Sequence, residues 1–405
     1  MSSAALTPAP TAGAPADMPR SLTQIVLANA IRRPGARVGL AWLGIVAFLA
    51  VFAPLLANSY PIVIKMDGRW SSPLLRNLTA ADVVLFAGTA AALTLLFVRS
   101  VPVPLRLLIL LGVILVSTAL AVWAIRPPKL RVYEEYREAE AAGRVQYVLR
   151  APIPYSPSDY LRDRFHADQP PAPHPWAPNS KHWLGTDRNG GDILSRMIHA
   201  CRIAMSVGFI STGIALIVGA IIGGLMGYFA GWVDLLGMRL VEIFSSMPTF
   251  YLLLACVAFF GRDLYIMMVI LGLVGWVGIA RFVRAEFLKL RHQDFVHAAT
   301  AAGLPLHRIL FRHILPNAMA PVLVSISFSI AAAILAETGL TFIGLGLVDE
   351  PSWGQLLNQA VSPGGGFHWW LAVFPGMAIF LTVFAYNMIG EALRDALDPR
   401  IMKRE

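Results

Sequence analysis

Long apolar runs separated by short polar stretches dominate this chain. An apolar helix crosses the hydrocarbon layer of a membrane in about 20 residues. Segments of that length recur along the sequence, which predicts an all-α polytopic membrane protein of about eight spans. The predicted spans are Val38–Leu56, Ala81–Val98, Leu107–Ile125, Ile203–Phe229, Leu240–Phe260, Leu264–Phe282, Ala318–Leu345 and Trp369–Ile389.

The polar stretches between the spans carry basic residues mainly on one side. Arginines precede the first span, lysine and arginine follow the last, and more occupy the turn near residues 99–106 and the loop 284–317. Positive charge in short loops marks the cytoplasmic side. We therefore expect cytoplasmic N- and C-termini. The stretch 126–202, which is also rich in arginine, then lies outside, and it is too long for the rule to apply.

The same pattern divides the chain into ordered segments. The segments are a cytoplasmic N-terminal tail (1–37), the first span (38–56), an outer loop with a transmembrane hairpin (57–125), an extracytoplasmic segment (126–202), a core (203–390) containing the cytoplasmic loop, and a cytoplasmic C-terminal tail (391–405). Near the end of the extracytoplasmic segment, Asp192 can cap a helix whose apolar face starts at Ile193. We expect that helix to lie in the membrane interface and to lead into the fourth span.

Composition agrees with a membrane protein. Hydrophobic residues make up 57% of the chain and charged residues 14%, whereas soluble domains have about 45–50% and about 25%. The net charge of +9 raises the question of nucleic acid, but the basic residues lie beside apolar blocks. Attraction to lipid headgroups explains this arrangement, so we expect a lipid partner and no nucleic acid.

The residue types that carry catalysis or bind cofactors form no recognisable site. The nine histidines and two cysteines lack the spacing of metal ligands. No cluster of catalytic residues is evident, and no Gly-x-x-x-x-Gly-Lys-[Ser/Thr] phosphate loop occurs. We therefore expect a chain that is not an enzyme, holds no metal or cofactor, and does not bind ATP through such a loop.

The cytoplasmic loop contains the stretch "HAATAAGLPLHRILFRHILPN", from His297 to Asn317. Its alanines, including Ala298 and Ala299, favour a short helix with a smooth face, and Asp294 is a candidate N-cap. Gly303 suits the position just after that helix, and the proline two residues later suits the first turn of the next.

A second short helix is expected to follow. Leu306, Ile309, Leu310 and His313 recur at helical spacing and form one apolar stripe. Arg308 and Arg312 lie on a different face. Pro316, which follows Leu315, should end this helix just before the seventh span. The pattern predicts a rigid wedge with a basic rim, of a shape that fits a groove on a cytoplasmic protein. A connector helix lying on the membrane surface is the alternative.

Two carboxylates fall inside predicted spans. Glu242 is near the cytoplasmic end of its span, where it can reach water or pair with Arg239. Glu337 is deeper, where an unpaired charge costs a few kcal/mol. It is a candidate for lining a transport pathway, or for satisfying polar groups at a helix junction.

At the wedge, the sequence resembles the permease subunits of binding-protein-dependent ABC importers. Ala298, Ala299, Gly303, Leu315 and Pro316 match the family pattern in type and spacing. His297 stands where glutamate is usual, and His313 where isoleucine is usual.

Four further stretches are similar to the C-type permease of the dipeptide, oligopeptide and nickel branch. They are "HWLGTDRNGGDILSR", "ILAETGLTFIGLGL", "PSWGQLL" and "NMIGEALRDALDPR". The resemblance runs from about Lys181 to the C-terminus. It implies a six-span type I permease core, to which the hairpin within 57–125 has been added by insertion.

The resemblance also implies a function. The chain would be a bacterial inner-membrane subunit that forms half of a pathway for peptides, with a companion B-type permease as the other half. Two cytoplasmic ATPases would bind ATP and Mg²⁺, and an extracytoplasmic solute-binding protein would deliver the solute. The residues implied in coupling to the ATPases are His297, Ala298, Ala299, Gly303, Leu306, Arg308, Arg312, Leu315 and Pro316.

Other functions fit the sequence less well. The same branch includes importers of nickel and other small solutes, and the sequence of this chain does not identify the transported solute. A secondary transporter or channel would favour internal repeats around an ion site in mid-membrane. No such repeat is evident.

Overall fold

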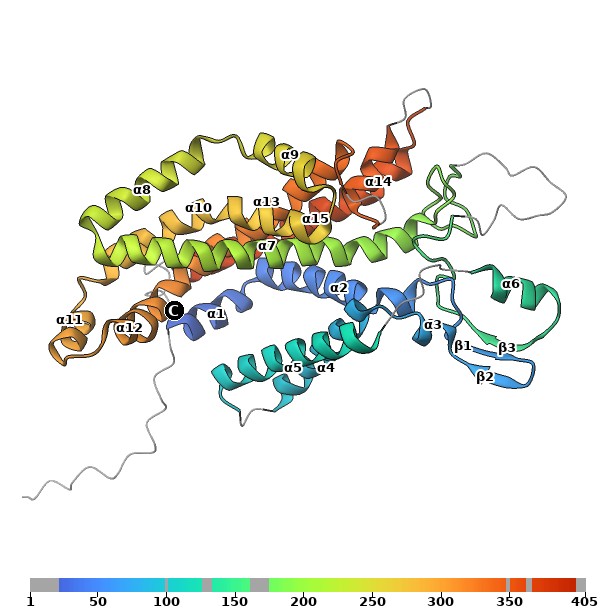
Figure 1. The fold of residues 1–405 in the computed structure, drawn as a ribbon, viewed down its shortest axis with the longest axis horizontal. Coiled ribbons are helices and arrows are strands. Elements are labelled where there is room, and N and C mark those ends of the chain that lie inside the picture. The colour runs from blue at the N-terminus through green and yellow to red at the C-terminus, as the bar shows by residue number, and fades with distance from the viewer. Residues whose placement is uncertain are drawn as a thin grey trace, which may run out of the picture.

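The computed structural model of the chain describes residues 22–98, 101–125, 133–160, 175–346, 350–361 and 366–397. These residues form an elongated bundle of helices (Figure 1). In the described part, seven helices are long and apolar enough to cross a membrane, and a bent helix pair would make an eighth. Much of the two predicted tails, including residues 1–21 and 398–405, lies outside the described residues.

The membrane-spanning helices follow the predicted order. They are α2 (Pro34–Leu56), α4 (Ala80–Phe97), α5 (Val103–Ala124), α7 (Ile193–Phe229), the bent pair α8 (Gly231–Ser246) and α9 (Thr249–Phe260), α10 (Leu264–Leu290), α13 (Leu315–Phe342) and α15 (Trp369–Ala396). The shorter elements are α1 (Leu22–Arg32), α3 (Pro73–Arg76), α6 (Glu134–Ala141), α11 (Asp294–Ala301), α12 (Leu306–Arg308), the π-helical turn η1 (Ile309–Ile314) and α14 (Trp353–Ala360).

The closest helix pair in the bundle is α7 with α10. Glycines on α7 let the two backbones approach. A Cβ at Gly219 would lie 2.9 Å from the carbonyl oxygen of Trp276, and one at Gly223 would overlap the carbonyl oxygen of Ala280. Small residues are the usual means by which membrane helices reach such contact. Helices α2 and α13 pack against this pair.

The expected interfacial helix is absent as a separate element. Ile193 begins α7 itself, which runs without a break to Phe229. Ile193 is fully buried, and Arg196 is buried with it. The Arg196 guanidinium is ion-paired with Asp187 and donates a hydrogen bond of 2.8 Å to Gln355 of α14. This pairing keeps a charged side chain in the interior, so the segment does not need to lie on a membrane surface.

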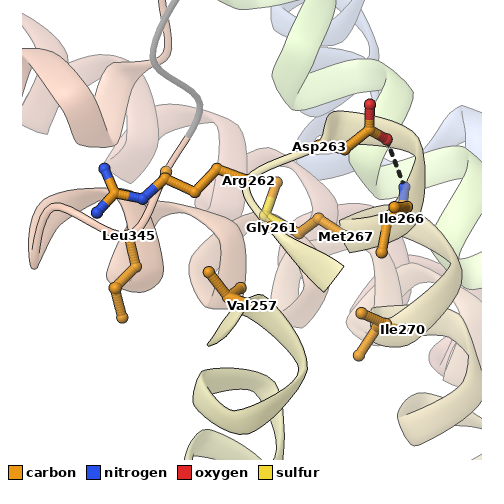
Figure 2. A pocket seen from close by; sticks show the side chains of 9 residues that line it. Val257, Gly261, Arg262, Asp263, Ile266, Met267, Ile270 and Leu345 are labelled. Atoms are coloured by element: carbon orange, nitrogen blue, oxygen red, sulfur yellow. Dashed lines mark hydrogen bonds between the residues drawn. The ribbon is translucent and has the colours of Figure 1, made fainter. Parts of the chain in front are cut away.

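The fifth predicted span, Leu240–Phe260, is not one helix. It bends by 78° between α8 and α9. Pro248 has no N–H to donate and disfavours helical backbone at Met247, which is extended (φ −80°, ψ 122°). A tight turn through Gly261 then joins α9 to α10, and the Asp263 carboxylate accepts the N–H of Ile266 at 2.9 Å (Figure 2).

The outer end of the molecule carries a small antiparallel sheet that the sequence analysis did not predict. Its strands are β1 (Val63–Met66), β2 (Arg69–Ser71) and β3 (Val145–Leu149), in the order β2-β1-β3. The sheet lies at the opposite end of the bundle from α11 and α12 (Figure 1).

The hairpin of α4 and α5 is largely exposed within the chain, and a polar contact joins it to the core. Asp82, near the start of α4, is buried and forms a capping box with Thr79. Arg202, in α7, forms an ion pair with Asp82, with 2.6 Å between Nη1 and Oδ1. Its Nε–H also donates a hydrogen bond of 3.2 Å to the carbonyl oxygen of Ala50. The charge that weakens α4 as a span therefore attaches the hairpin to α2 and α7.

Candidate functional site

The loop that joins α10 to α13 projects from one end of the bundle, the end that also holds α1 and the last described residues of α15 (Figure 1). We call residues 291–314 the basic loop. It contains α11, α12 and η1, and most of the residues singled out by the sequence analysis.

The first helix of the basic loop begins one residue earlier than expected. Gln293 occupies the N-cap position and no side-chain hydrogen bond caps the helix. Asp294, the predicted cap, is instead the first helical residue. Its carboxylate there still lies beside the positive end of the helix dipole, which accounts for an acidic residue at this point.

The end of α11 is built as the sequence predicts. Gly303 has a φ of +70°, in the left-handed region that glycine adopts without strain. Its N–H donates to the carbonyl oxygen of Thr300 at 3.0 Å, and the N–H of Leu304 donates to that of Ala299 at 3.2 Å. These two bonds are the Schellman arrangement. They fix the direction in which the chain leaves α11.

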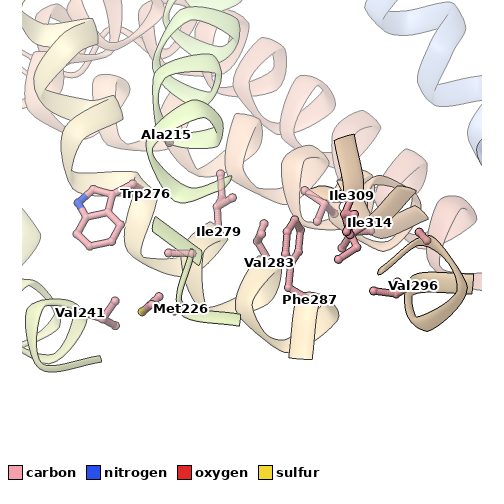
Figure 3. Packing of buried hydrophobic residues seen from close by; sticks show 14 residues of the cluster. Ala215, Met226, Val241, Trp276, Ile279, Val283, Phe287, Val296, Ile309 and Ile314 are labelled. Carbon is pink, nitrogen blue, oxygen red and sulfur yellow. The ribbon is translucent and has the colours of Figure 1, made fainter. Parts of the chain in front are cut away.

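The inner side of the basic loop packs onto the bundle. Val296 and Ala299 of α11 are buried together with Ile309 and Ile314 of η1, and the cluster continues to Phe287 of α10 (Figure 3). Leu304 packs against the same cluster. The loop is therefore joined by apolar contacts to both helices that it connects.

The second helix of the loop differs from the prediction. Ile309 is 3% exposed and Ile314 is 0% exposed, whereas Leu306 is 40% exposed. The reason is the π-helical turn η1, in which the N–H of Leu315 donates to the carbonyl oxygen of Leu310. Five-residue spacing brings Ile309 and Ile314 onto one face. A stripe drawn at 3.6 residues per turn included Leu306 and missed Ile314.

Pro316 does not end the helix. It lies in the first turn of α13, where its missing N–H has no required partner. The side-chain amide of Asn317 donates to the carbonyl oxygen of His313 at 2.7 Å. The chain therefore continues from Leu306 to Phe342 as one helical path, with the π turn inside it.

The outer side of the basic loop is open. Seven of the nine predicted coupling residues are exposed, six of them in this loop and one at the start of α13, while Ala299 is buried and Leu315 is half-buried. The exposed residues are His297, Ala298, Gly303, Leu306, Arg308, Arg312 and Pro316. Phe311, which the sequence analysis did not single out, joins them at 68% exposure. Within the described residues, no ion pair involves Arg308 or Arg312.

Glu337 is placed away from the basic loop, at a junction of α13 with α14. It is 2% exposed, and its carboxylate has the hydroxyls of Thr338, Thr341 and Ser352 as neighbours. Among the described residues, its Oε1 atom has no hydrogen-bond partner. A role for Glu337 in a pathway stays a prediction.

Glu242 pairs with Arg239 as the spacing suggests, with 2.6 Å between Oε2 and Nη1. Within the described ranges, no three His, Cys, Asp or Glu side chains are grouped as metal ligands.

Comparison with known proteins gives a consistent result. Residues 219–403 match the family model described as "binding-protein-dependent transport system inner membrane component". The chain is 32% identical to the inner membrane ABC transporter permease protein YejE of Escherichia coli, over 88% of this chain and 92% of the relative. It is 39% identical to the oligopeptide transport system permease protein OppC of Haemophilus influenzae, over 54% and 70% of the two chains.

A dipeptide transport system permease protein, DppC of Bacillus subtilis, is 35% identical over 56% of this chain and 71% of the relative. Among solved structures, the inward-facing MetNI methionine ABC transporter is similar with a TM-score of 0.41 and 16% identity, over 51% of this chain and 98% of that chain.

The buried side of the basic loop gives a stability prediction. Replacing Ile314 with Ala should destabilise the protein by about 2–5 kcal/mol, because the side chain is fully enclosed and leaves a cavity. The measurement is the melting temperature of the purified protein in detergent. Phe311→Ala is the matched control from the same turn, and its melting temperature should stay unchanged since Phe311 is exposed. Equal losses in both variants would contradict the packing described.

Proposed function

Because the chain belongs to the family of binding-protein-dependent transport system inner membrane components, we propose that it is the permease subunit of an ABC importer for peptides. Membership makes it a transport subunit and a multi-pass protein of the bacterial inner membrane. The fold is that of a type I permease preceded by additional N-terminal helices. The peptide cargo is proposed from the names of the oligopeptide and dipeptide permeases to which it is similar.

The observation that carries the proposal is the basic loop. Its inner side is packed onto α10 and α13, its outer side is exposed, and it continues into α13 as unbroken helix. In this proposal, a push on the outer side moves α13. A flexible connector would absorb the same displacement without passing it on.

In this proposal, two cytoplasmic ATPases supply the force. ATP and Mg²⁺ bind to those partners, and closure of the ATPase pair moves the basic loop. Arg308 and Arg312, which are exposed, would face acidic residues on the ATPase and contribute mainly to orientation and rate of encounter. The end of the bundle that carries the basic loop, α1 and the end of α15 would be the cytoplasmic end.

The other partners act at the membrane and outside it. A companion permease would form the second half of the pathway, and an extracytoplasmic solute-binding protein would deliver peptides to the end that carries the small sheet. Glu337 is proposed as a residue of that pathway. The burial of an ionisable side chain within a membrane span supports this, because such residues usually have a functional role.

Gly303 tests the mechanical role of the basic loop. Gly303→Val should reduce ATP-driven peptide uptake by about tenfold, because the left-handed backbone costs an L residue roughly 1–2 kcal/mol and a factor of ten corresponds to about 1.4 kcal/mol. A Cβ at this position meets open space, so the effect is one of backbone conformation. Gly303→Asn is the control, since asparagine tolerates this conformation. Full uptake in the valine variant would refute the assignment.

Glu337→Gln tests the pathway role. Glutamine keeps the shape of the side chain but removes its charge, so a pathway residue should give altered peptide uptake at normal protein abundance in the membrane. Unaltered uptake at normal abundance would restrict Glu337 to the helix junction.

A further inference from the structure

The bent pair α8–α9 is the least covered part of the core. Both helices are described throughout, and each has one buried residue, Val241 in α8 and Leu253 in α9. The bend between them is open as well. Met247 is 41% exposed, and Pro248 and Thr249 are exposed with it.

This bend lies at membrane depth. Phe244 and Leu252, on either side of it, line the same cavity as Leu273 and Val274 of α10. These α10 residues come about ten positions after the start of the helix at Leu264, or roughly 15 Å at 1.5 Å per residue. The hydrocarbon layer is about 30 Å thick. The bend is therefore near the middle of the bilayer.

Non-helical backbone cannot face lipid at that depth. Hydrocarbon offers no hydrogen-bond partner, so irregular backbone occurs in membranes only where protein covers it or water reaches it. Pro248 is at the N-cap of α9, and its side chain has no polar atom, so it does not cap the N–H groups of the first turn. The exposed side of the bend must meet either another protein surface or water.

Charged and polar groups along α8 favour water. Arg239, Glu242 and Ser245 recur at three-residue spacing along α8, and the pair Arg239–Glu242 has side chains 69% and 51% exposed. Arg281 of α10, also exposed, donates a hydrogen bond to the Ser245 hydroxyl. The centre of a protein interface is depleted in charge, and charge facing lipid is costly. An aqueous path satisfies both the polar stripe and the bend.

An apolar cavity of about 530 Å³ opens beside the bend, between α9 and α10. Its walls include Phe260, Val269 and Leu273, and Cys256 of α9 is also among the lining residues. The cavity is large enough for bulky side chains. Water along the polar stripe can hydrate the main chain of a peptide, and the apolar cavity can contact its side chains.

We propose that this face of α8–α9, with the cavity beside it, lines the aqueous path taken by the transported peptide, the cavity accepting apolar side chains and the polar stripe meeting the main chain. The inference rests on the proposed importer function and adds to it the part of this chain that touches the cargo.

Cys256 is a natural probe of this proposal. The chain has one other cysteine, Cys201, which is 4% exposed, and a Cys201→Ala background leaves Cys256 alone. In the assembled transporter, a charged thiosulfonate should modify Cys256 about tenfold faster than a cysteine placed at Leu115 of α5, because only a hydrated thiol ionises and reacts. An apolar-rich peptide should slow modification of Cys256, and Ser245→Cys should react in the same way.

Two other outcomes overturn the proposal. Modification of Cys256 by a lipid-soluble maleimide but not by the charged reagent would place it against lipid. Modification by neither reagent in the assembly, and by both after dissociation, would place it in a subunit interface.

Peptide-stimulated ATP hydrolysis by the same preparation separates failure of the path assignment from failure of the importer function. If it persists while the labelling result is contrary, the importer function stands and the path assignment fails. If it is absent, the importer function fails.

Discussion

One helical path connects the basic loop to the membrane-spanning part of the molecule, and the proposed coupling depends on its continuity. The chain from Leu306 to Phe342 is one helical path that includes the π turn and Pro321. The side chains of Ile309 and Ile314 fix the start of that path to the bundle. Bending it would break backbone hydrogen bonds or expose buried isoleucine. We propose that a displacement at the loop is passed on to α13, as coupling to an external motor would require.

The two halves of the core are built differently, and the difference fits their proposed tasks. Glycines such as Gly219 and Gly223 hold α7 against α10 with almost no space between the backbones. The bent pair α8–α9 has one buried residue in each helix and an open cavity beside it. The first half supplies stiffness, and the second leaves a polar and irregular surface inside the membrane, where only cargo, water or a partner can satisfy it.

Hydrophobic length and the chemistry of glycine were sufficient to predict the order of the spans, apart from the break in the fifth, and the end of α11. The position of Gly303 after the helix could be predicted because few other residues adopt its backbone conformation. The missed features depend on contacts between distant residues. Arg196 is buried because Asp187 and Gln355 are there to pair with it, and no local pattern shows that. The π turn changes the period within six residues, so a 3.6-residue stripe selected Leu306 and overlooked Ile314. Pro248 was visible, but whether a proline only kinks a span or breaks it depends on neighbouring helices.

The central claim is that the outer side of the basic loop bears on a nucleotide-hydrolysing partner. A photo-activated cross-linker on a cysteine at Ala302, at the exposed end of α11, tests it directly in native membranes, with the same cross-linker at Gln146 in β3 as the control for the opposite end of the molecule. The account predicts cross-linking from position 302 to an ATPase subunit, with a yield that changes when ATP is added, and none from position 146. Cross-links from position 302 to lipid alone would contradict it.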